Sequence, residues 1–307
     1  MIRRFLHRLR QFKMRRSSIH GNRRIEKAVE RLARTATADS VVVIDAGARF
    51  GTHLSSRFSA LDRQGMLDYT GFEPDEDECR RLRERFPGHD FRPVALGRQE
   101  TERKLVKTDA PGCSSFLQPG KEFLQHFPSI APWFEVTGQQ QVEVTTLDRF
   151  LEGEESADML KSDTQGYEME VLEGAGETLE EISVVELELF FKQVYRDQAL
   201  FDEVHRFLAD KGFEVVDMEF ARWNHGGKVN GPGHPGDGRK IDGELVEADV
   251  LFTRTEFNSR SKMEKNLLLL ASYGKFSTAL RIARENRELL EAKDELEDVL
   301  EDLATGS

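Results

Sequence analysis

The sequence predicts an α/β fold in which a mostly parallel sheet carries helices on both faces. A β-branched run at 41–44 leads into a turn with two glycines, as a buried parallel strand does before a helix. A second strand-like run follows at 67–72, one βαβ unit further along. Strand-like and helix-like segments then alternate to about residue 255, the pattern of a parallel sheet with crossover helices.

The turn after the first strand can come close to a ligand. Asp45 ends the strand, and Gly47 and Gly51 permit a tight turn at the start of the next helix. The spacing Gly-x-x-x-Gly differs from the Gly-x-Gly-x-x-Gly of dinucleotide sites, which argues against NAD. The alternative is that both glycines only shape a strand–turn–helix.

An acidic residue ends the second predicted strand. Glu73 lies 28 positions after Asp45, where a carboxylate can accept hydrogen bonds from both ribose hydroxyls of a nucleoside. Pro74 fixes the chain as it leaves the strand. The three acids at 75–77 suit the solvated first turn of a helix.

Charged residues gather around another strand-to-helix turn, at 160–168. Asp163 is expected at the carboxyl end of its strand, the edge at which open α/β sheets bind ligands. Lys161, two residues earlier on the same side, is placed to pair with Asp163 and keep it ionised. Glu168 begins the helix, and Glu186 is expected to end the neighbouring strand and face the same site. The alternative is that Lys161 and Glu168 form an ion pair that fixes the turn.

Taken in order, these segments resemble the FkbM-type S-adenosylmethionine (SAM)-dependent methyltransferases over about residues 38–255. The Lys-x-Asp-x-x-Gly-x-Glu run that starts at Lys161 is the most distinctive match. The matching segments are 45–51, 71–74, 94–97, 113–116, 144–151, 160–168, 171–175, 184–186 and 248–252.

The resemblance implies a Rossmann-like sheet of seven strands, SAM as cofactor, and methyl transfer to a hydroxyl oxygen of a sugar, glycan or glycolipid. The residues expected to bind the cofactor are Asp45, Gly47, Ala48, Gly51, Glu73 and Pro74. Attack by a hydroxyl needs alignment and a group that takes its proton. Asp163 is the first candidate for this base or for orienting the acceptor, with Lys161 as its partner, and Glu168 and Glu186 are the further candidates.

The sequence departs from the family pattern at Arg49, where the family usually carries Asn. A guanidinium there could pair with Asp45 or reach the carboxylate of SAM. No spacing demands a metal, although a divalent cation held by Asp163, Glu168 and Glu186 is an alternative. Two other classes stay open, a catalytically silent methyltransferase fold that acts as a scaffold and a nucleotide-sugar or NAD-linked enzyme.

Composition fits an enzyme of the reducing cytoplasm. The chain has 307 residues, of which 38% are hydrophobic and 33% charged, enough for one substantial core. A net charge of −12 argues against nucleic acid as the main partner. Two cysteines give neither a disulfide framework nor a metal-binding spacing, and no run is long enough to span a membrane.

Both ends of the chain differ from the central domain. The N-terminal segment, 1–37, starts with nine Lys or Arg and no acid within 1–24, with apolar residues at helical spacing. It is expected to lie on an anionic membrane at the inner face, to pack on the catalytic domain, or to form a basic tail. The extension 256–307 predicts two amphipathic helices, at 262–273 and 276–303, that mediate homo-oligomerisation or bind a partner.

Between these ends, further strands are expected at 91–96, 142–147 and 183–191, with a closing antiparallel pair at 213–218 and 249–253. The aromatic, proline-rich segment 110–140 predicts either a lid over the acceptor or a packed insertion. His225 and His234 belong to a glycine-rich loop and are expected to be solvated, with contact to the substrate as the alternative.

Overall fold

The computed structural model describes residues 23–153, 156–225, 243–290 and 295–305. Residues 1–22 of the predicted N-terminal segment therefore fall outside the described residues, as does His234. His225 is described: its ring stacks on Phe127 with centroids 4.4 Å apart, and Glu244 lies 3.3 Å from its Nε2.

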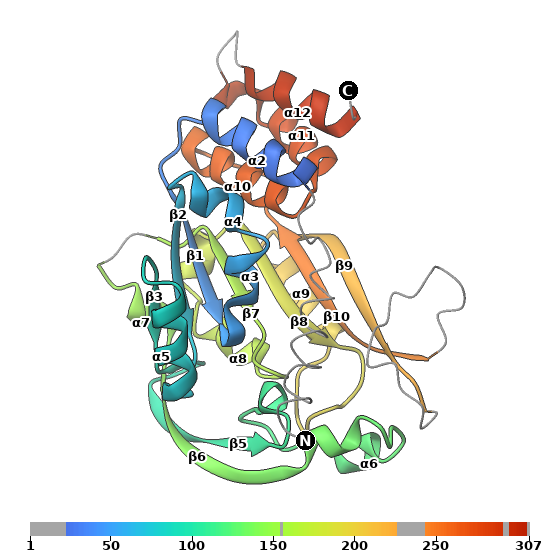
Figure 1. Ribbon diagram of the computed structural model, residues 1–307. Coiled ribbons are helices and arrows are strands. Elements are labelled where there is room, and N and C mark those ends of the chain that lie inside the picture. The colour runs from blue at the N-terminus through green and yellow to red at the C-terminus, as the bar shows by residue number, and fades with distance from the viewer. Residues whose placement is uncertain (1–22, 154–155, 226–242, 291–294, 306–307) are drawn as a thin grey trace.

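A seven-stranded sheet forms the centre of the molecule, in the order β3-β2-β1-β7-β8-β10-β9 (Figure 1). Its strands are β1 (Val41–Ala46), β2 (Leu67–Phe72), β3 (Asp90–Arg92), β7 (Met159–Ser162), β8 (Val184–Phe190), β9 (Glu214–Trp223) and β10 (Glu244–Thr253). The strands from β3 to β8 pair in parallel, and β10 runs antiparallel to both its neighbours. The predicted Rossmann-like sheet with a closing antiparallel pair is confirmed.

The two faces of the sheet bury different sets of side chains because residues alternate along each strand. One face packs Val41, Val43 and their neighbours against α3 (Thr52–Ser55), α4 (Ser59–Arg63) and α5 (Glu76–Arg85). The other packs Ile44, Leu160 and Leu187 against α7 (Leu147–Phe150), α8 (Glu168–Glu173) and α9 (Phe201–Ala209). Helices therefore cover both faces, as predicted.

A three-stranded sheet, ordered β4-β6-β5, lies beyond the carboxyl ends of the parallel strands (Figure 1). Its strands are β4 (Ala95–Leu96), β5 (Thr101–Thr108) and β6 (Val136–Thr145). The single strand predicted at 91–96 is wrong, because its two halves pair in different sheets as β3 and β4. β5 was not predicted, since its first four residues are polar and mostly exposed.

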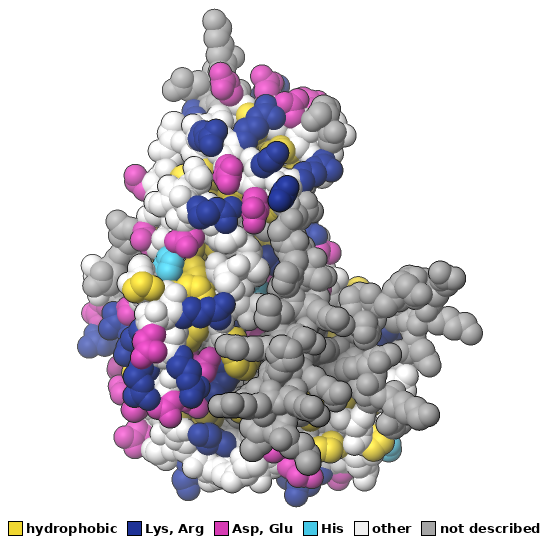
Figure 2. Space-filling model, viewed as in Figure 1, with side chains coloured by type: hydrophobic (Ala, Val, Ile, Leu, Met, Phe, Trp, Pro, Cys, Tyr) yellow, Lys and Arg dark blue, Asp and Glu magenta, His cyan; other side chains and the backbone are white. Residues whose placement is uncertain are grey.

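Four helices form a cap at the opposite end of the sheet (Figure 1). They are α2 (Arg23–Thr35), α10 (Arg260–Ser272), α11 (Phe276–Glu285) and α12 (Glu295–Thr305). The single helix predicted at 276–303 is wrong, because a short helix, η5 (Arg287–Leu289), separates α11 from α12. The apolar sides of all four helices join the core of the sheet, and the visible outer side carries interspersed basic and acidic side chains (Figure 2).

α10 attaches this cap to the amino ends of the parallel strands. Glu264 accepts hydrogen bonds from the N–H groups of Thr37 and Ala38, both at 2.7 Å, just before β1. Lys265 lies 3.1 Å from Asp158, which precedes β7. Asn266 Nδ2 donates to the carbonyl oxygen of Ser183, before β8, at 3.3 Å.

The segment between β5 and β6 is a packed insertion, one of the two predicted alternatives. It contains the short helices η2 (Pro111–Cys113), α6 (Lys121–Leu124) and η3 (Ala131–Phe134). Phe127 and Ile130 are buried together with Tyr195 and Trp223 from the main sheet side. Among the residues that the structure describes, none of the helices has the length and hydropathy of a membrane span.

Candidate functional site

A charged row crosses the sheet on the face that α3 covers. In register, Asp45 of β1 lies beside Lys161 of β7, and Lys161 lies beside Glu186 of β8. On the same face, one pleat earlier, the residues are the apolar Val43, Met159 and Val184, which are fully buried. The apolar face thus turns charged toward the carboxyl ends of the strands, where open α/β sheets bind ligands.

The charged row lines a cavity. The carboxylates that line it are Asp45, Asp163, Glu186, Glu188, Glu219 and Asp249. Arg49, Arg57 and Lys161 supply positive charge, and Thr52, His53 and Ser162 complete the lining. Four residues predicted for the site, Asp45, Lys161, Asp163 and Glu186, therefore meet in one place.

Lys161 pairs more closely with Asp45 than with Asp163. Its Nζ lies 2.9 Å from Asp45 Oδ1 and 4.0 Å from Asp163 Oδ2. Burial alone would lower the pKa of Lys161, but the two carboxylates raise it above its ordinary value. Tyr69 also donates its hydroxyl hydrogen to Asp45. The predicted pairing with Asp163 is thus secondary, and an ion pair of Lys161 with Glu168 is not formed.

Gly47 brings the turn after β1 against the turn after β7. It has φ +80°, and a Cβ there would lie 2.2 Å from the carbonyl oxygen of Asp163. Gly51 has φ +55°, and a Cβ there would meet the ring of Phe86 at 2.4 Å. Only glycine fits this combination of backbone conformation and close approach. Ala48, between them, is buried, and its N–H donates to the carbonyl oxygen of Phe72 at 3.1 Å.

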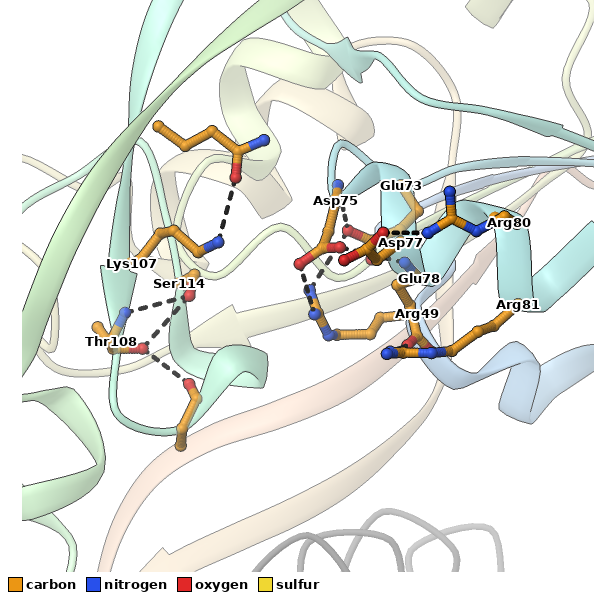
Figure 3. Close-up of polar contacts among 12 residues, drawn as sticks. Arg49, Glu73, Asp75, Asp77, Glu78, Arg80, Arg81, Lys107, Thr108 and Ser114 are labelled. Carbon is orange, nitrogen blue, oxygen red and sulfur yellow. Dashed lines mark hydrogen bonds and ion pairs between the residues drawn. The ribbon is translucent and has the colours of Figure 1, made fainter. Parts of the chain in front are cut away.

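Arg49 bridges two carboxylates at the end of β2 (Figure 3). Its guanidinium lies 3.3 Å from Glu73 and 3.2 Å from Asp75. The pair of Arg49 with Asp45, one of the two alternatives, is not formed, because Lys161 and Tyr69 already contact Asp45. Asp75 follows Pro74 and caps α5 by accepting a hydrogen bond from the N–H of Glu78 at 3.1 Å. Asp75 is therefore a helix cap and an ion-pair partner of Arg49, and not only a solvated residue of the first helical turn as expected.

Burial dominates the electrostatics of Glu73. It raises the pKa of this carboxyl, although the charge of Arg49 acts in the opposite direction. Burial also raises the pKa of Asp75, but there the N–H of Glu78 and the charge of Arg49 prevail and lower it. Arg49 Nε is buried and has no acceptor among the described residues. A buried donor next to a buried carboxylate, beside a glycine turn, fits the hydroxyls and carboxylate of a nucleoside-type cofactor such as SAM.

Glu168 points into its own turn. Its Oε1 accepts hydrogen bonds from the N–H of Thr164 at 2.8 Å and from the Thr164 hydroxyl at 3.1 Å. Complete burial raises the pKa of Glu168 to about 8. It does not line the cavity that holds Asp163. The catalytic role of Glu168 stays a prediction. Its two hydrogen bonds with Thr164 stabilise the turn after β7.

Asp163 is held at the cavity by the same turn. Its backbone N–H donates to the carbonyl oxygen of Ala46 at 3.0 Å, which joins the turn to β1. Gln165 Nε2 donates to Asp163 Oδ1 at 2.8 Å and also to Glu188. Gln165 Oε1 in turn accepts from the hydroxyl of Tyr195 at 2.9 Å. Asp163 is therefore oriented by a chain of hydrogen bonds that begins at Tyr195, whose ring packs against the insertion.

Glu186 lies within β8 and does not end it as expected, whereas the strand predicted at 183–191 is confirmed. It accepts a hydrogen bond from the hydroxyl of Tyr273 at 2.8 Å, and His53 Nε2 lies 2.8 Å from the same oxygen. Burial would raise the pKa of Glu186, but His53, Arg57 and the Tyr273 hydroxyl lower it to about 2.

The sequence reasoning missed His53, Arg57 and Tyr273. His53 follows Gly51 by two residues, so its place at the start of the helix after the glycine turn was a usable signal. Arg57 Nη2 lies 2.7 Å from Glu219, and its guanidinium stacks 4.7 Å above the Tyr273 ring. Tyr273 comes from the C-terminal extension, and only the packing of α10 against the sheet brings it here.

The arrangement does not form a metal site. Within the described ranges, no three His, Cys, Asp or Glu side chains are grouped so that they could hold a metal ion. Asp163, Glu168 and Glu186, the alternative cation ligands, point to different partners.

Comparison with known proteins identifies one family. The model described as "Methyltransferase FkbM domain" matches residues 45–215, more than half of the chain and every residue predicted for the site. No curated protein matches the chain.

Several solved structures are distantly similar to this chain. Magnesium protoporphyrin IX methyltransferase from Synechocystis PCC 6803, with bound SAM, is 11% identical with a TM-score of 0.36, covering 75% of this chain and 77% of that one. Precorrin-6y C5,15-methyltransferase from Geobacter metallireducens GS-15 is 12% identical with a TM-score of 0.33, covering 72% and 84%. A TehB-like SAM-dependent methyltransferase from Corynebacterium glutamicum has the same identity and TM-score, covering 74% and 87%.

Proposed function

Because this chain belongs to the FkbM methyltransferase family, we propose that it transfers a methyl group to a hydroxyl oxygen of a sugar, glycan or glycolipid. The chain is a methyltransferase, and its cofactor is SAM. When bound, SAM supplies an electrophilic methyl group on a positively charged sulfur. The residues that would hold it are those around the Gly47 turn together with Glu73 and Arg49.

One observation carries the choice of acceptor: every side chain that lines the cavity beside Asp163 is polar or charged. Small-molecule sites are usually lined mainly by apolar and aromatic side chains. A lining made of polar and charged residue types suits an acceptor with many hydroxyl groups, each of which needs a hydrogen-bond partner when it leaves water. This favours a glycan over a flat, apolar acceptor.

Asp163 is the residue proposed to orient the reacting hydroxyl. It lies directly after β7, and the Gln165 amide fixes one of its oxygens. Its carboxylate accepts a hydrogen bond from the hydroxyl and so turns a lone pair of the acceptor oxygen toward the methyl group. Asp163→Asn keeps the shape but removes the charge, and the loss of this orienting group should lower turnover by about 10²-fold.

The experiment is transfer of a ¹³C-labelled methyl group from SAM to a panel of glycans, glycolipids and matched amino sugars. Label on oxygen, with Asp163→Asn slower by the factor above and SAM affinity retained in calorimetry, supports the proposal. Label on nitrogen or carbon contradicts it. Failure to bind SAM at all would favour the alternative of a silent scaffold.

We also propose that the protein works in the cytoplasm and meets a lipid-linked acceptor at an anionic membrane surface. The support is the charge of residues 1–24, nine Lys or Arg without an acid. Each such charge near an anionic surface contributes about 1 kcal/mol to binding. Homo-oligomerisation through the C-terminal helices remains a second proposal about partners, although their apolar sides already pack within this chain.

A further inference from the structure

His53 and Glu186 form an imidazole–carboxylate pair inside the cavity. His53 belongs to α3, directly after the glycine turn, and 22% of its side chain is exposed. Its Nε2 lies 2.8 Å from Glu186 Oε2. Glu186 lies next to Lys161 in the charged row. The pair is therefore open to the cavity on the histidine side and closed on the carboxylate side.

Glu186 itself is poorly suited to remove a proton. Its side chain is 8% exposed, and its Oε2 already faces the two donors from His53 and Tyr273. Arg57 and the hydroxyl of Tyr273 favour its ionised form even where His53 is neutral, and a carboxylate stabilised in this way is a weak base. An ionised carboxylate that accepts from Nε2 holds the neutral imidazole in the form that carries its proton on Nε2. The lone pair then lies on Nδ1.

We propose that His53 is the general base of the methyl transfer, and that Glu186 is the residue that positions it. The inference rests on the proposed function, because it needs an acceptor that loses a proton. Asp163 orients the hydroxyl, and His53 removes its hydrogen. The two roles that the sequence analysis gave to Asp163, taking the proton and orienting the acceptor, are thus divided between His53 and Asp163.

The atoms and electrons balance without another reactant. A lone pair of the acceptor oxygen forms the new O–C bond, and the S–C bond breaks with its electron pair left on sulfur. The hydroxyl O–H bond breaks with its pair left on oxygen, and the proton goes to Nδ1 of His53. Glu186 stabilises the resulting imidazolium, which returns its proton to water.

Other charged groups surround the pair and contribute to its pH dependence. Arg57, between α3 and α4, and Tyr273, after α10, act on Glu186. The remaining charged groups in the same cavity include Asp45, Lys161, Glu188, Glu219 and Asp249. Because these groups surround the pair, a pH profile must be compared between variants rather than interpreted alone.

The test uses the full chain and compares His53→Gln with a matched control. His89 provides the control, because its Nε2 lies 3.1 Å from Asp62 and it does not line the cavity. His53→Gln should lower kcat by about 10²–10⁴-fold, with the affinity for SAM unchanged in calorimetry. The rise of kcat with pH that marks loss of a proton from the base should vanish. His89→Gln should retain the wild-type rate and profile.

A second readout needs no turnover. In the cofactor-free protein, ¹⁵N–¹H correlation spectra should show neutral His53 with its proton on Nε2 and none on Nδ1. Glu186→Gln should weaken that preference. A proton on Nδ1 in the wild-type protein would overturn the assignment even if His53→Gln failed to fold.

The outcomes separate this inference from the proposed function. If the wild-type protein methylates no hydroxyl, the proposed function fails and His53 loses its role as well. If it methylates hydroxyls and His53→Gln matches it in rate and pH profile, only the role of His53 is wrong. If His53→Gln loses SAM binding, His53 belongs to the cofactor site and is not the base.

Discussion

Replacing Glu168 by Gln should stabilise the protein increasingly as the pH rises. The side chain is buried in the turn after β7, and its Oε1 accepts two hydrogen bonds from Thr164. Gln keeps an oxygen that can accept both bonds. What it removes is a carboxyl whose pKa is about 8 in the folded protein, compared with an ordinary value of 4.5.

The sign follows from proton binding. Between pH 4.5 and 8 the folded protein keeps this proton while the unfolded chain has lost it, so the free energy of unfolding falls as the pH rises. The 3.5 pH units between the two values correspond to about 5 kcal/mol at 1.36 kcal/mol per unit. That is a large share of the free energy of unfolding of a typical domain, which is about 5–15 kcal/mol.

The assay is guanidinium unfolding of wild type and Glu168→Gln at pH 5, 7 and 9. The advantage of the variant should be small at the lowest pH and grow toward the full value at the highest. Glu173→Gln, on the same helix but partly exposed beside Arg98, controls for the removal of one carboxylate. A stability difference that does not change with pH, or one that shrinks as the pH rises, would refute the reasoning.

Two further predictions concern the cofactor site and the N-terminus. Gly47→Val should abolish SAM binding, because its Cβ would collide with the Asp163 carbonyl oxygen 2.2 Å away. Glu73→Ala should weaken SAM binding by removing the carboxylate expected to meet the ribose. Calorimetry on the folded variants measures both affinities, and unchanged affinity in both would contradict the assigned site. Deleting residues 1–22, which contain seven of the basic residues, should abolish binding to anionic vesicles at low salt while SAM affinity persists. Stopping before Arg23 spares α2, whose Arg24 donates to the carbonyl oxygen of Leu303. Equal vesicle binding with and without the segment would exclude a membrane role for it.

Local sequence is sufficient to predict a strand or a site residue where hydrophobic periodicity and a motif occur in the same segment. The strand at 41–46, the glycine turn and the run around Asp163 carry their signal within about ten residues, and the structure places them at one edge of the sheet. β5 gave no such signal, because its exposed polar residues do not alternate with apolar ones. Pairing with β6 alone makes it a strand.

The partners of site residues were less predictable because they come from distant parts of the chain. Lys161 was assigned to Asp163 by proximity in sequence, yet the register of β1 and β7 places Asp45 nearer. Likewise, Arg49 finds its partners at Glu73 and Asp75 of the next strand-to-helix turn. Tyr273 could not have been predicted, since 87 residues separate it from Glu186.

The attachment of α10 has a consequence for the order of assembly during synthesis. The bonds from Thr37 and Ala38 to Glu264 join residues 227 and 226 positions apart. Contacts of such long range form late, because a large loop must close first. A nascent chain that already contains both glycine turns and the whole parallel sheet still lacks the hydroxyl that Tyr273 donates to Glu186. A chain that stops before Tyr273 therefore leaves Glu186 without this hydrogen bond, so the charged row is complete only after α10 has docked on the sheet.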